Sequence, residues 1–168
     1  MSLAFVGRVW SSFLQTSGLE PTLIPKLLLK DAKPGHVSLE LTVEQSHTNR
    51  LKILHGGTVA ALVDLSGSLA VASRGMYSTG VTTDLNVTYI SSGGKVGDKI
   101  FIESYCHKLG RNLAFTTVEF FKPAGKSPAF LPRTPESLEL FARGTHTKYI
   151  AQAMKDPQNA LDQLNKPL

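Results

Sequence analysis

The sequence is poor in cysteine: Cys106 is the single one among 168 residues. One thiol cannot form an internal disulfide or build a cysteine-based zinc site, so no metal site is expected. Cys106 and His107 are neighbours in a strand-like segment, which puts their side chains on opposite faces and argues against a nucleophilic Cys–His pair. The lone thiol also fits a reducing compartment, and we expect an intracellular protein of the cytoplasm or mitochondrion.

Long apolar runs and runs of one charge are missing as well. The longest uncharged apolar stretch, which follows Asp64, is far shorter than a membrane span, so no stable membrane insertion is expected. The net charge is +5, but the basic residues are dispersed and no nucleic-acid motif is present, so no nucleic-acid partner is expected. Dispersed basic side chains fit either an ordinary solvated surface or attraction for a small polyanion such as a phosphorylated cofactor.

The length of the chain allows a single domain, 1–168, with one core. Apolar residues recur at helical spacing in residues 1–20, which predicts an amphipathic helix docked on the fold; a weak mitochondrial presequence is the alternative. Three prolines in residues 21–35 favour a loop with short extended pieces. The core is expected over 35–150, and 151–168 is a weakly specified tail.

Hydrophobic patterns inside the core predict one long helix and five strands. Apolar residues occupy nearly every face of residues 57–73, which indicates a buried central helix. Alternating apolar and polar residues predict strands over 37–43, 79–91, 98–108, 112–122 and 138–150. Because no helix separates the last four strands, we expect hairpin-like connections between them and an α+β fold, in which one antiparallel sheet wraps around the helix. The proline-bearing loop 123–136 is expected to decorate the surface; the alternative is that it borders the tunnel for the acyl group.

His55, Gly56 and Gly57 stand immediately before the predicted central helix. Two glycines at a helix start let a ligand approach the backbone closely. They also leave unsatisfied N–H groups at the positive end of the helix dipole, which can hold a phosphate or polarise a carbonyl as an oxyanion hole. Most Gly-Gly pairs are simply turns, so this pair alone is a weak signal.

Asp64 is a carboxylate within the apolar sequence Leu-Val-Asp-Leu of the same helix. Burying it costs several kcal/mol unless the carboxylate is paired or useful, so it is either a hydrogen-bonded core aspartate or a functional group. Eight residues separate it from Gly56, roughly 12 Å along a helix axis. If both groups act on one substrate, the site is expected at a dimer interface, with the aspartate supplied by the neighbouring subunit.

Six segments of the sequence together resemble the PaaI-like hotdog thioesterases, and they cover most of residues 35–150. They are His-Thr-Asn-Arg-Leu (47–51), Leu-His-Gly-Gly (54–57), Leu-Val-Asp (62–64), Thr-Asp-Leu-Asn-Val-Thr-Tyr (83–89), Leu-Gly-Arg-Asn-Leu-Ala-Phe-Thr (109–116) and Arg-Gly-Thr-His-Thr-Lys (143–148). The resemblance implies a hotdog fold and a homotetramer, a dimer of dimers, that hydrolyses acyl-CoA to free acid and coenzyme A. It implies no cofactor, because coenzyme A is part of the substrate.

Catalytic roles follow from the resemblance by position. The Gly56 N–H would polarise the thioester carbonyl, and Asp64 would activate water or attack directly. Asn49 would position the water or the acyl group, and Thr82 would assist where a member of the family carries serine. His55 would shape the loop in preference to acting as a base.

The resemblance also places coenzyme A on three segments of the chain. Basic side chains at a hairpin tip could pair with its phosphates, although ordinary turn solvation explains them equally simply. The histidine in this set is alternatively a structural core histidine. The implied coenzyme A residues are Tyr89, Ser91, Lys108, Arg111, Asn112 and His146.

Three functions therefore remain open from the sequence. The first is metal-free thioester hydrolysis, with a hydrophobic acyl group that is medium- or long-chain fatty acyl or aryl-acetyl. The second is a hotdog dehydratase or hydratase that pairs a histidine with a carboxylate as acid and base. The third is a non-catalytic module that binds acyl-CoA. The presence of Asn49, Gly56 and Asp64 together favours catalysis.

Overall fold

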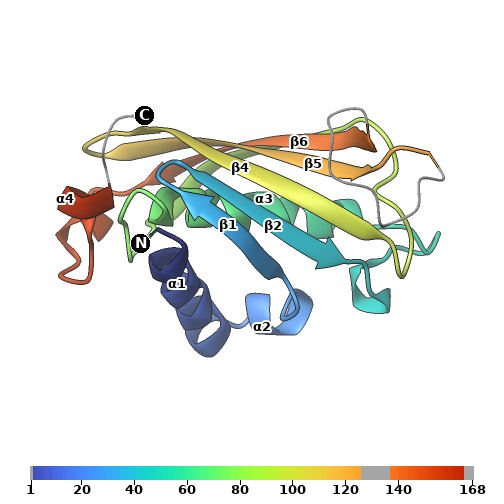
Figure 1. Cartoon of the computed structure of the whole chain (residues 1–168), viewed down its shortest axis with the longest axis horizontal. Helices are drawn as coiled ribbons and strands as arrows, with labels where there is room; N and C mark the ends of the chain where they lie inside the picture. The colour runs from blue at the N-terminus through green and yellow to red at the C-terminus, as the bar shows by residue number, and fades with distance from the viewer. Residues whose placement is uncertain (1, 126–136, 165–168) are drawn as a thin grey trace.

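The computed structural model describes residues 2–125 and 137–164, which fold into one antiparallel sheet around one long helix (Figure 1). In chain order the elements are α1 (Ser2–Thr16), α2 (Glu20–Leu23), β1 (Leu28–Lys33), β2 (His36–Thr42), the 3-10 helix η1 (Gln45–His47), α3 (Gly56–Ala72), β3 (Val81–Tyr89), β4 (Lys99–Leu109), β5 (Leu113–Pro123), β6 (Leu138–Tyr149), the 3-10 helix η3 (Ala153–Lys155) and α4 (Leu161–Leu164). The predicted α+β arrangement of a sheet wrapped around a central helix is confirmed.

The sheet has the strand order β1-β2-β4-β5-β6-β3, with every neighbouring pair antiparallel. The hairpin-like connections expected after β3 hold for β4–β5 and β5–β6 but are wrong for β3–β4. β3 pairs with β6 at one edge, whereas β4 lies on the other side of β5. A long loop, 90–98, makes this passage possible, because a tight hairpin would hold consecutive strands side by side.

β1 is a full edge strand where the sequence predicts only a loop with short extended pieces. It pairs with β2 from Leu28 opposite Glu40 to Lys33 opposite His36, with an irregularity between Leu29 and Asp31. Its sequence, Leu-Leu-Lys-Asp-Ala-Lys, contains no β-branched or aromatic residue, so it carries little local strand signal. Pairing with β2 and contact with α1 stabilise a strand that local propensity does not predict.

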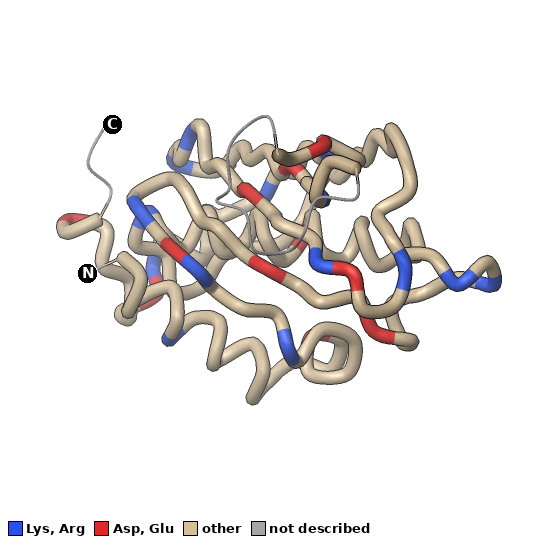
Figure 2. Tube along the Cα trace, turned by 45° about the vertical axis from the view of Figure 1, so that its right-hand side comes forward, with Lys and Arg blue, Asp and Glu red and all other residues tan. Residues whose placement is uncertain are grey.

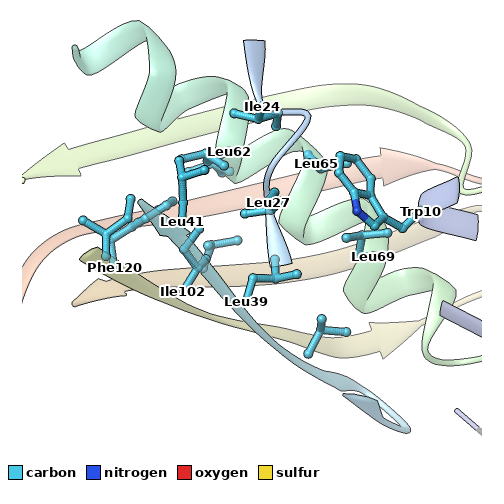
Figure 3. Close-up of a cluster of buried hydrophobic side chains, with 14 of the residues drawn as sticks. Trp10, Ile24, Leu27, Leu39, Leu41, Leu62, Leu65, Leu69, Ile102 and Phe120 are labelled. Carbon is cyan, nitrogen blue, oxygen red and sulfur yellow. The ribbon is translucent and has the colours of Figure 1, made fainter. Parts of the chain in front are cut away.

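α3 lies against the concave face of the sheet and contacts β2, β3, β4, β5 and β6 (Figure 1). Side chains from both layers interdigitate in the core drawn in Figure 3. The labelled members are all buried: Trp10, Ile24, Leu27, Leu39, Leu41, Leu62, Leu65, Leu69, Ile102 and Phe120. The helix that the sequence predicts over 57–73 thus forms within one residue of the expected bounds.

α1 packs against β1 and α3, so the predicted docked helix is confirmed. Phe5, Val6, Val9 and Trp10 form its buried side. Lys, Arg, Asp and Glu are interspersed along the rest of the trace in Figure 2, in keeping with the dispersed charge of the sequence. Within residues 2–125 and 137–164, no helix has the length and apolarity that crossing a membrane requires.

Cys106 and His107 point to opposite faces of β4, as expected. Cys106 is buried, and burial raises the pKa of its thiol to about 11, so it is not a nucleophile at neutral pH. His107 is exposed and lies 2.6 Å from the Thr117 hydroxyl on β5. The expected surface loop, 123–136, lies almost entirely outside the described residues.

Leu69→Ala tests the packing of α3 against the sheet, because Leu69 is fully buried in the core. Loss of its side chain leaves a cavity and is expected to lower the unfolding free energy by about 3 kcal/mol. Chemical denaturation followed by the fluorescence of Trp10, the single tryptophan, measures this change. Leu19→Ala, at an exposed leucine, is the matched control and should cost less than about 0.5 kcal/mol. Equal costs at the two positions would contradict this packing.

Candidate active site

The segment that leads into α3 is tied to the core by His47, which is buried. The His47 carbonyl accepts the backbone N–H of His55 at 2.9 Å and the Thr58 hydroxyl at 3.2 Å. The His47 ring accepts the Glu44 N–H and lies 2.7 Å from the Leu23 carbonyl. These bonds fix where the helix begins, a role that the sequence does not indicate.

Asn49 holds the turn just before this segment. Its side-chain oxygen accepts the N–H groups of Leu51 at 2.8 Å and Ile53 at 3.4 Å. The amide nitrogen of the same side chain forms no hydrogen bond with any residue in the described part of the chain. Asn49 therefore keeps two N–H donors for a water or a substrate oxygen.

His55 is the N-cap of α3, and its ring nitrogen Nδ1 accepts the Gly57 N–H at 2.7 Å. This bond fits the loop-shaping role that we expect for His55 in preference to a role as a base. The Gly56 N–H, by contrast, has no acceptor among residues 2–125 and 137–164. One free N–H thus remains at the positive end of a 17-residue helix, a geometry that can stabilise an oxyanion.

Tyr89, at the end of β3, lies over this helix start. Its hydroxyl donates to the Gly56 carbonyl at 2.8 Å, and a Cβ on Gly56 would come within 3.3 Å of the tyrosine ring. Gly56 is therefore needed partly for close approach and not only for freedom of the backbone. About half of Tyr89 is exposed, which leaves one side of the ring open to a ligand.

Asp64 lies two turns further along α3, with its side chain 49% exposed. The Thr82 hydroxyl at the start of β3 donates to Asp64 Oδ1 at 2.9 Å. His146 Nε2, on β6, lies 2.9 Å from the Thr82 hydroxyl and 3.2 Å from the same carboxylate oxygen. Since the threonine proton points to the carboxylate, the threonine oxygen accepts from His146 Nε2–H. Three residues from three elements thus form one chain of hydrogen bonds.

Gly67 makes room for His146 beneath the helix. A Cβ at Gly67 would come within 2.4 Å of His146 Nδ1 and 2.7 Å of the Thr116 hydroxyl, which no packing tolerates. His146 Nδ1 is buried and has no hydrogen-bond partner in the described residues. Burial, followed by the charge of Lys148, lowers the pKa of His146 to about 4 despite the opposing effect of Asp64. The imidazole is therefore neutral at pH 7.

Lys148 completes the cluster, although the sequence analysis does not select it. Its Nζ lies 2.8 Å from Ser68 Oγ and 3.7 Å from Asp64 Oδ1, and only 4% of its side chain is exposed. Burial lowers the pKa of Lys148, and Asp64 opposes that shift. The alternation of β6 could have revealed it, because Lys148 shares the inward face with Gly144, His146 and Ile150.

The residues expected to bind coenzyme A fall into groups at opposite ends of the sheet. Tyr89 and Ser91 lie at the end of β3, where the Ser91 hydroxyl donates to Glu139 at 3.0 Å. Lys108 near the end of β4, and Arg111 and Asn112 in the turn between β4 and β5, are all exposed. Leu113, which follows them, is opposite Tyr149, and Tyr149 is opposite Val81 at the start of β3. Eight residues of β3 separate the groups, roughly 26 Å. His146 lies buried beside Asp64 and outside both.

The expected catalytic residues are also kept apart. Gly56 contacts Tyr89 at one end of β3, whereas Asp64 contacts Thr82 at the other. Gly56 and Asp64 are eight residues apart on the continuous helix α3, roughly 12 Å along its axis. Within one chain the free N–H and the carboxylate are therefore not brought together. Among the described residues, no group of three or more His, Cys, Asp or Glu side chains is placed to hold a metal ion.

The sequence pattern of the thioesterase superfamily matches residues 51–129, which include both ends of β3. A Schizosaccharomyces pombe protein named as an esterase is 41% identical over 160 residues, covering 95% of this chain and 91% of its own. Human acyl-coenzyme A thioesterase 13 is 37% identical over 129 residues, covering 76% of this chain and 82% of its own. The chain belongs to the thioesterase superfamily. It is a thioesterase enzyme.

The solved structures agree with this assignment. Zebrafish thioesterase superfamily member 2 superimposes with a TM-score of 0.71 at 33% identity, over 89% of this chain and 98% of the zebrafish chain. The resemblance to the hotdog thioesterases and the hotdog fold are thereby confirmed.

His146→Gln tests whether the site histidine is held neutral. Because the pKa of His146 lies below its usual 6.5 in the folded chain, the unfolded chain binds the proton first as the pH falls. The parent should therefore lose up to about 3 kcal/mol of unfolding free energy between pH 7 and pH 4 that the variant does not lose. Urea denaturation at several pH values and one protein concentration measures both slopes. Identical slopes would show that His146 is not a buried neutral group.

Proposed function

We propose that this thioesterase hydrolyses acyl-CoA to a free acid and coenzyme A, with Asp64 as the reacting carboxylate and the Gly56 N–H as the oxyanion donor. The observation that carries the proposal is the state of Asp64: one oxygen is held by the Thr82 hydroxyl, and half of the side chain is open to solvent. A carboxylate held in this way can accept a proton from water or attack a carbonyl itself. Human acyl-coenzyme A thioesterase 13 supports acyl-CoA as the substrate class.

The hydrolysis requires few groups. A water bound at the free oxygen of Asp64 gives it a proton and attacks the thioester carbon, while the Gly56 N–H takes up the negative charge on the carbonyl oxygen. The carbon–sulfur bond then breaks, and the departing thiolate receives the proton held by Asp64. In the alternative route Asp64 attacks the thioester carbon, and the carbon–sulfur bond breaks to release coenzyme A as the thiolate. Water then cleaves the anhydride, which returns Asp64 and gives the acid, and the proton set free passes to the thiolate. The side-chain amide of Asn49 orients the water or the acyl carbonyl in either route.

In this proposal, a second copy of the chain brings the Gly56 N–H and the Asp64 carboxylate together. β3 is the last strand of the sheet, and most of its side chains are exposed. If the β3 strands of two copies pair antiparallel, the start of one β3 lies beside the end of the other. Each Gly56 and Tyr89 would then face the partner's Asp64 and Thr82. Such a dimer contains two composite sites, and each site needs both chains.

The outer face of the sheet offers a second contact, which supports the proposed dimer of dimers. Val81, Tyr149 and Leu113 are aligned in register across β3, β6 and β5, and Phe115 lies two residues further along β5. All four are large and exposed hydrophobic residues. An apolar row of this kind on a sheet face is typical of a protein–protein contact.

Coenzyme A would join the two halves of the composite site. Tyr89 and Ser91 belong to the half with Gly56, and the exposed turn with Lys108, Arg111 and Asn112 belongs to the half with Asp64. In a β3-paired dimer the partner's turn approaches the Gly56 half, where its Lys108 and Arg111 can bind phosphates. The acyl group is hydrophobic in this proposal, either medium- or long-chain fatty acyl or aryl-acetyl.

Asp64→Asn tests the reacting carboxylate. The amide keeps the size of the side chain but can neither accept a proton from water nor attack, so kcat should fall by at least about 100-fold. Thiol release from a panel of fatty acyl-CoA and aryl-acetyl-CoA substrates measures this effect. Asp162→Asn, at an exposed aspartate of α4 outside the candidate site, is the matched control and should retain the parent's rate. Undiminished hydrolysis by Asp64→Asn would refute the assigned chemistry.

Gly56→Pro tests the oxyanion donor and the composite site together. Proline removes the N–H and is favoured at the first position of a helix, so kcat should fall by about 100-fold or more. Gly56→Ala adds a Cβ but keeps the N–H and is the matched control. When Gly56→Pro and Asp64→Asn chains are unfolded and refolded together, half of the dimers are mixed and each has one intact site.

Such a mixture should therefore recover about a quarter of the parent's activity. Each variant refolded alone should stay inactive. If the mixture also stays inactive although mixed dimers form, as native mass spectrometry can establish, the two groups do not act across an interface.

A further inference from the structure

Lys148 is a buried cation whose role the hydrolysis scheme leaves open. Its side chain is 4% exposed, on the inward face of β6 between His146 and Ile150. Lysine is almost never fully buried unless it is paired. The pairing here is with Asp64, whose Oδ1 lies 3.7 Å from Lys148 Nζ.

Ser68 fixes the position of the lysine ammonium. The Ser68 hydroxyl donates to the Asp64 carbonyl one turn earlier on α3, at 2.9 Å. Its proton is thereby used, so its oxygen accepts from Lys148 Nζ at 2.8 Å. The ammonium is held behind the Asp64 carboxylate, on the protein side, while the exposed side of that carboxylate stays open.

At neutral pH, Lys148 is the cation that pairs with Asp64. The ion pairs of Asp64 within the described residues are with His146 and Lys148, and burial keeps His146 uncharged. Asp84 on β3 and Glu20 at the start of α2 are the other charged groups acting on this cluster, and both are negative. Without Lys148, the carboxylate would share its surroundings with other acids and a neutral ring.

We propose that Lys148 is a positioning residue that holds the Asp64 carboxylate aligned for attack, acting from behind it and without touching the substrate. The inference rests on the proposed function, because it assigns Lys148 to the same reaction. Its physical content is electrostatic: the ammonium at 3.7 Å attracts the carboxylate and limits the orientations that it can take.

Lys148→Met tests this inference by separating kcat from KM. Methionine fills similar space without a charge, so the Asp64 carboxylate loses the contact that orients it. The kcat of the variant should fall by about tenfold or more. KM should change little, because Lys148 lies behind the carboxylate.

Two further variants separate charge from packing. Lys148→Arg keeps the cation and should restore kcat to within about threefold of the parent. Lys99→Met removes an exposed lysine paired with Glu40 and should leave kcat unchanged. A kcat that stays at the parent's value in Lys148→Met would overturn the proposal, as would an equal loss in Lys148→Arg.

A second measurement covers the case in which Lys148→Met does not fold. The pairing is reciprocal, so removal of the Asp64 charge in Asp64→Asn should lower the pKa of Lys148 further. NMR titration of 13C-labelled lysine should show the Lys148 midpoint at least about half a unit lower in Asp64→Asn than in the parent. An unchanged midpoint would break the link between the two groups. The titration needs no turnover, so it stays decisive even if the parent releases no thiol and the proposed function itself fails.

Discussion

Everything at the candidate site depends on holding one carboxylate, Asp64, on a helix that is otherwise apolar on nearly every face. A carboxylate in that place must be paired or solvated, and the fold provides both. Thr82 and the buried Lys148 approach it from the sheet, and its other side is open to solvent. The reactive group is therefore held from behind and accessible from the front.

The backbone, as much as the side chains, determines which groups surround that carboxylate. β6 brings His146 and Lys148 onto one face by strand alternation, and β3 places Thr82 opposite Lys148 in register. The helix can lie close to β6 because Gly144 and Gly67 lack side chains: a Cβ on Gly144 would collide with Val63, and one on Gly67 with His146. Small residues at the helix–sheet contact are thus what allow polar groups to fill the remaining space.

Sequence patterns predicted the parts of the fold that depend on strong periodicity. The long helix was predicted within one residue because apolar residues occupy nearly all of its faces, and the strands after it follow clear alternation. β1 was not predicted as a strand, because Lys30, Asp31 and Lys33 carry no strand propensity and pairing with β2 decides their conformation. The sheet order was not predictable either, since nothing in a loop's sequence states which edge the next strand joins.

The residues of the candidate site were likewise predicted only in part. Local motifs indicated Gly56 and Asp64, because glycines before a helix and a carboxylate inside an apolar helix are visible along the chain, whereas Asn49 came only from the resemblance. Lys148 was missed because its role is indicated by a contact with Ser68, which is 80 residues earlier in the chain. His146 was selected for coenzyme A by resemblance, whereas its contacts place it behind Asp64.

The free N–H and the carboxylate mark opposite ends of one exposed edge strand. Hydrogen bonds tie Gly56 to Tyr89 and Asp64 to Thr82, so neither group can move toward the other without breaking the contact that orients it. An extended strand cannot shorten, and a helix cannot bend enough to bring two of its own residues together over two turns. The reaction proposed above therefore draws on a second edge strand running the other way, and another copy of this chain would present one with matching groups. Association and catalysis would then depend on the same strand.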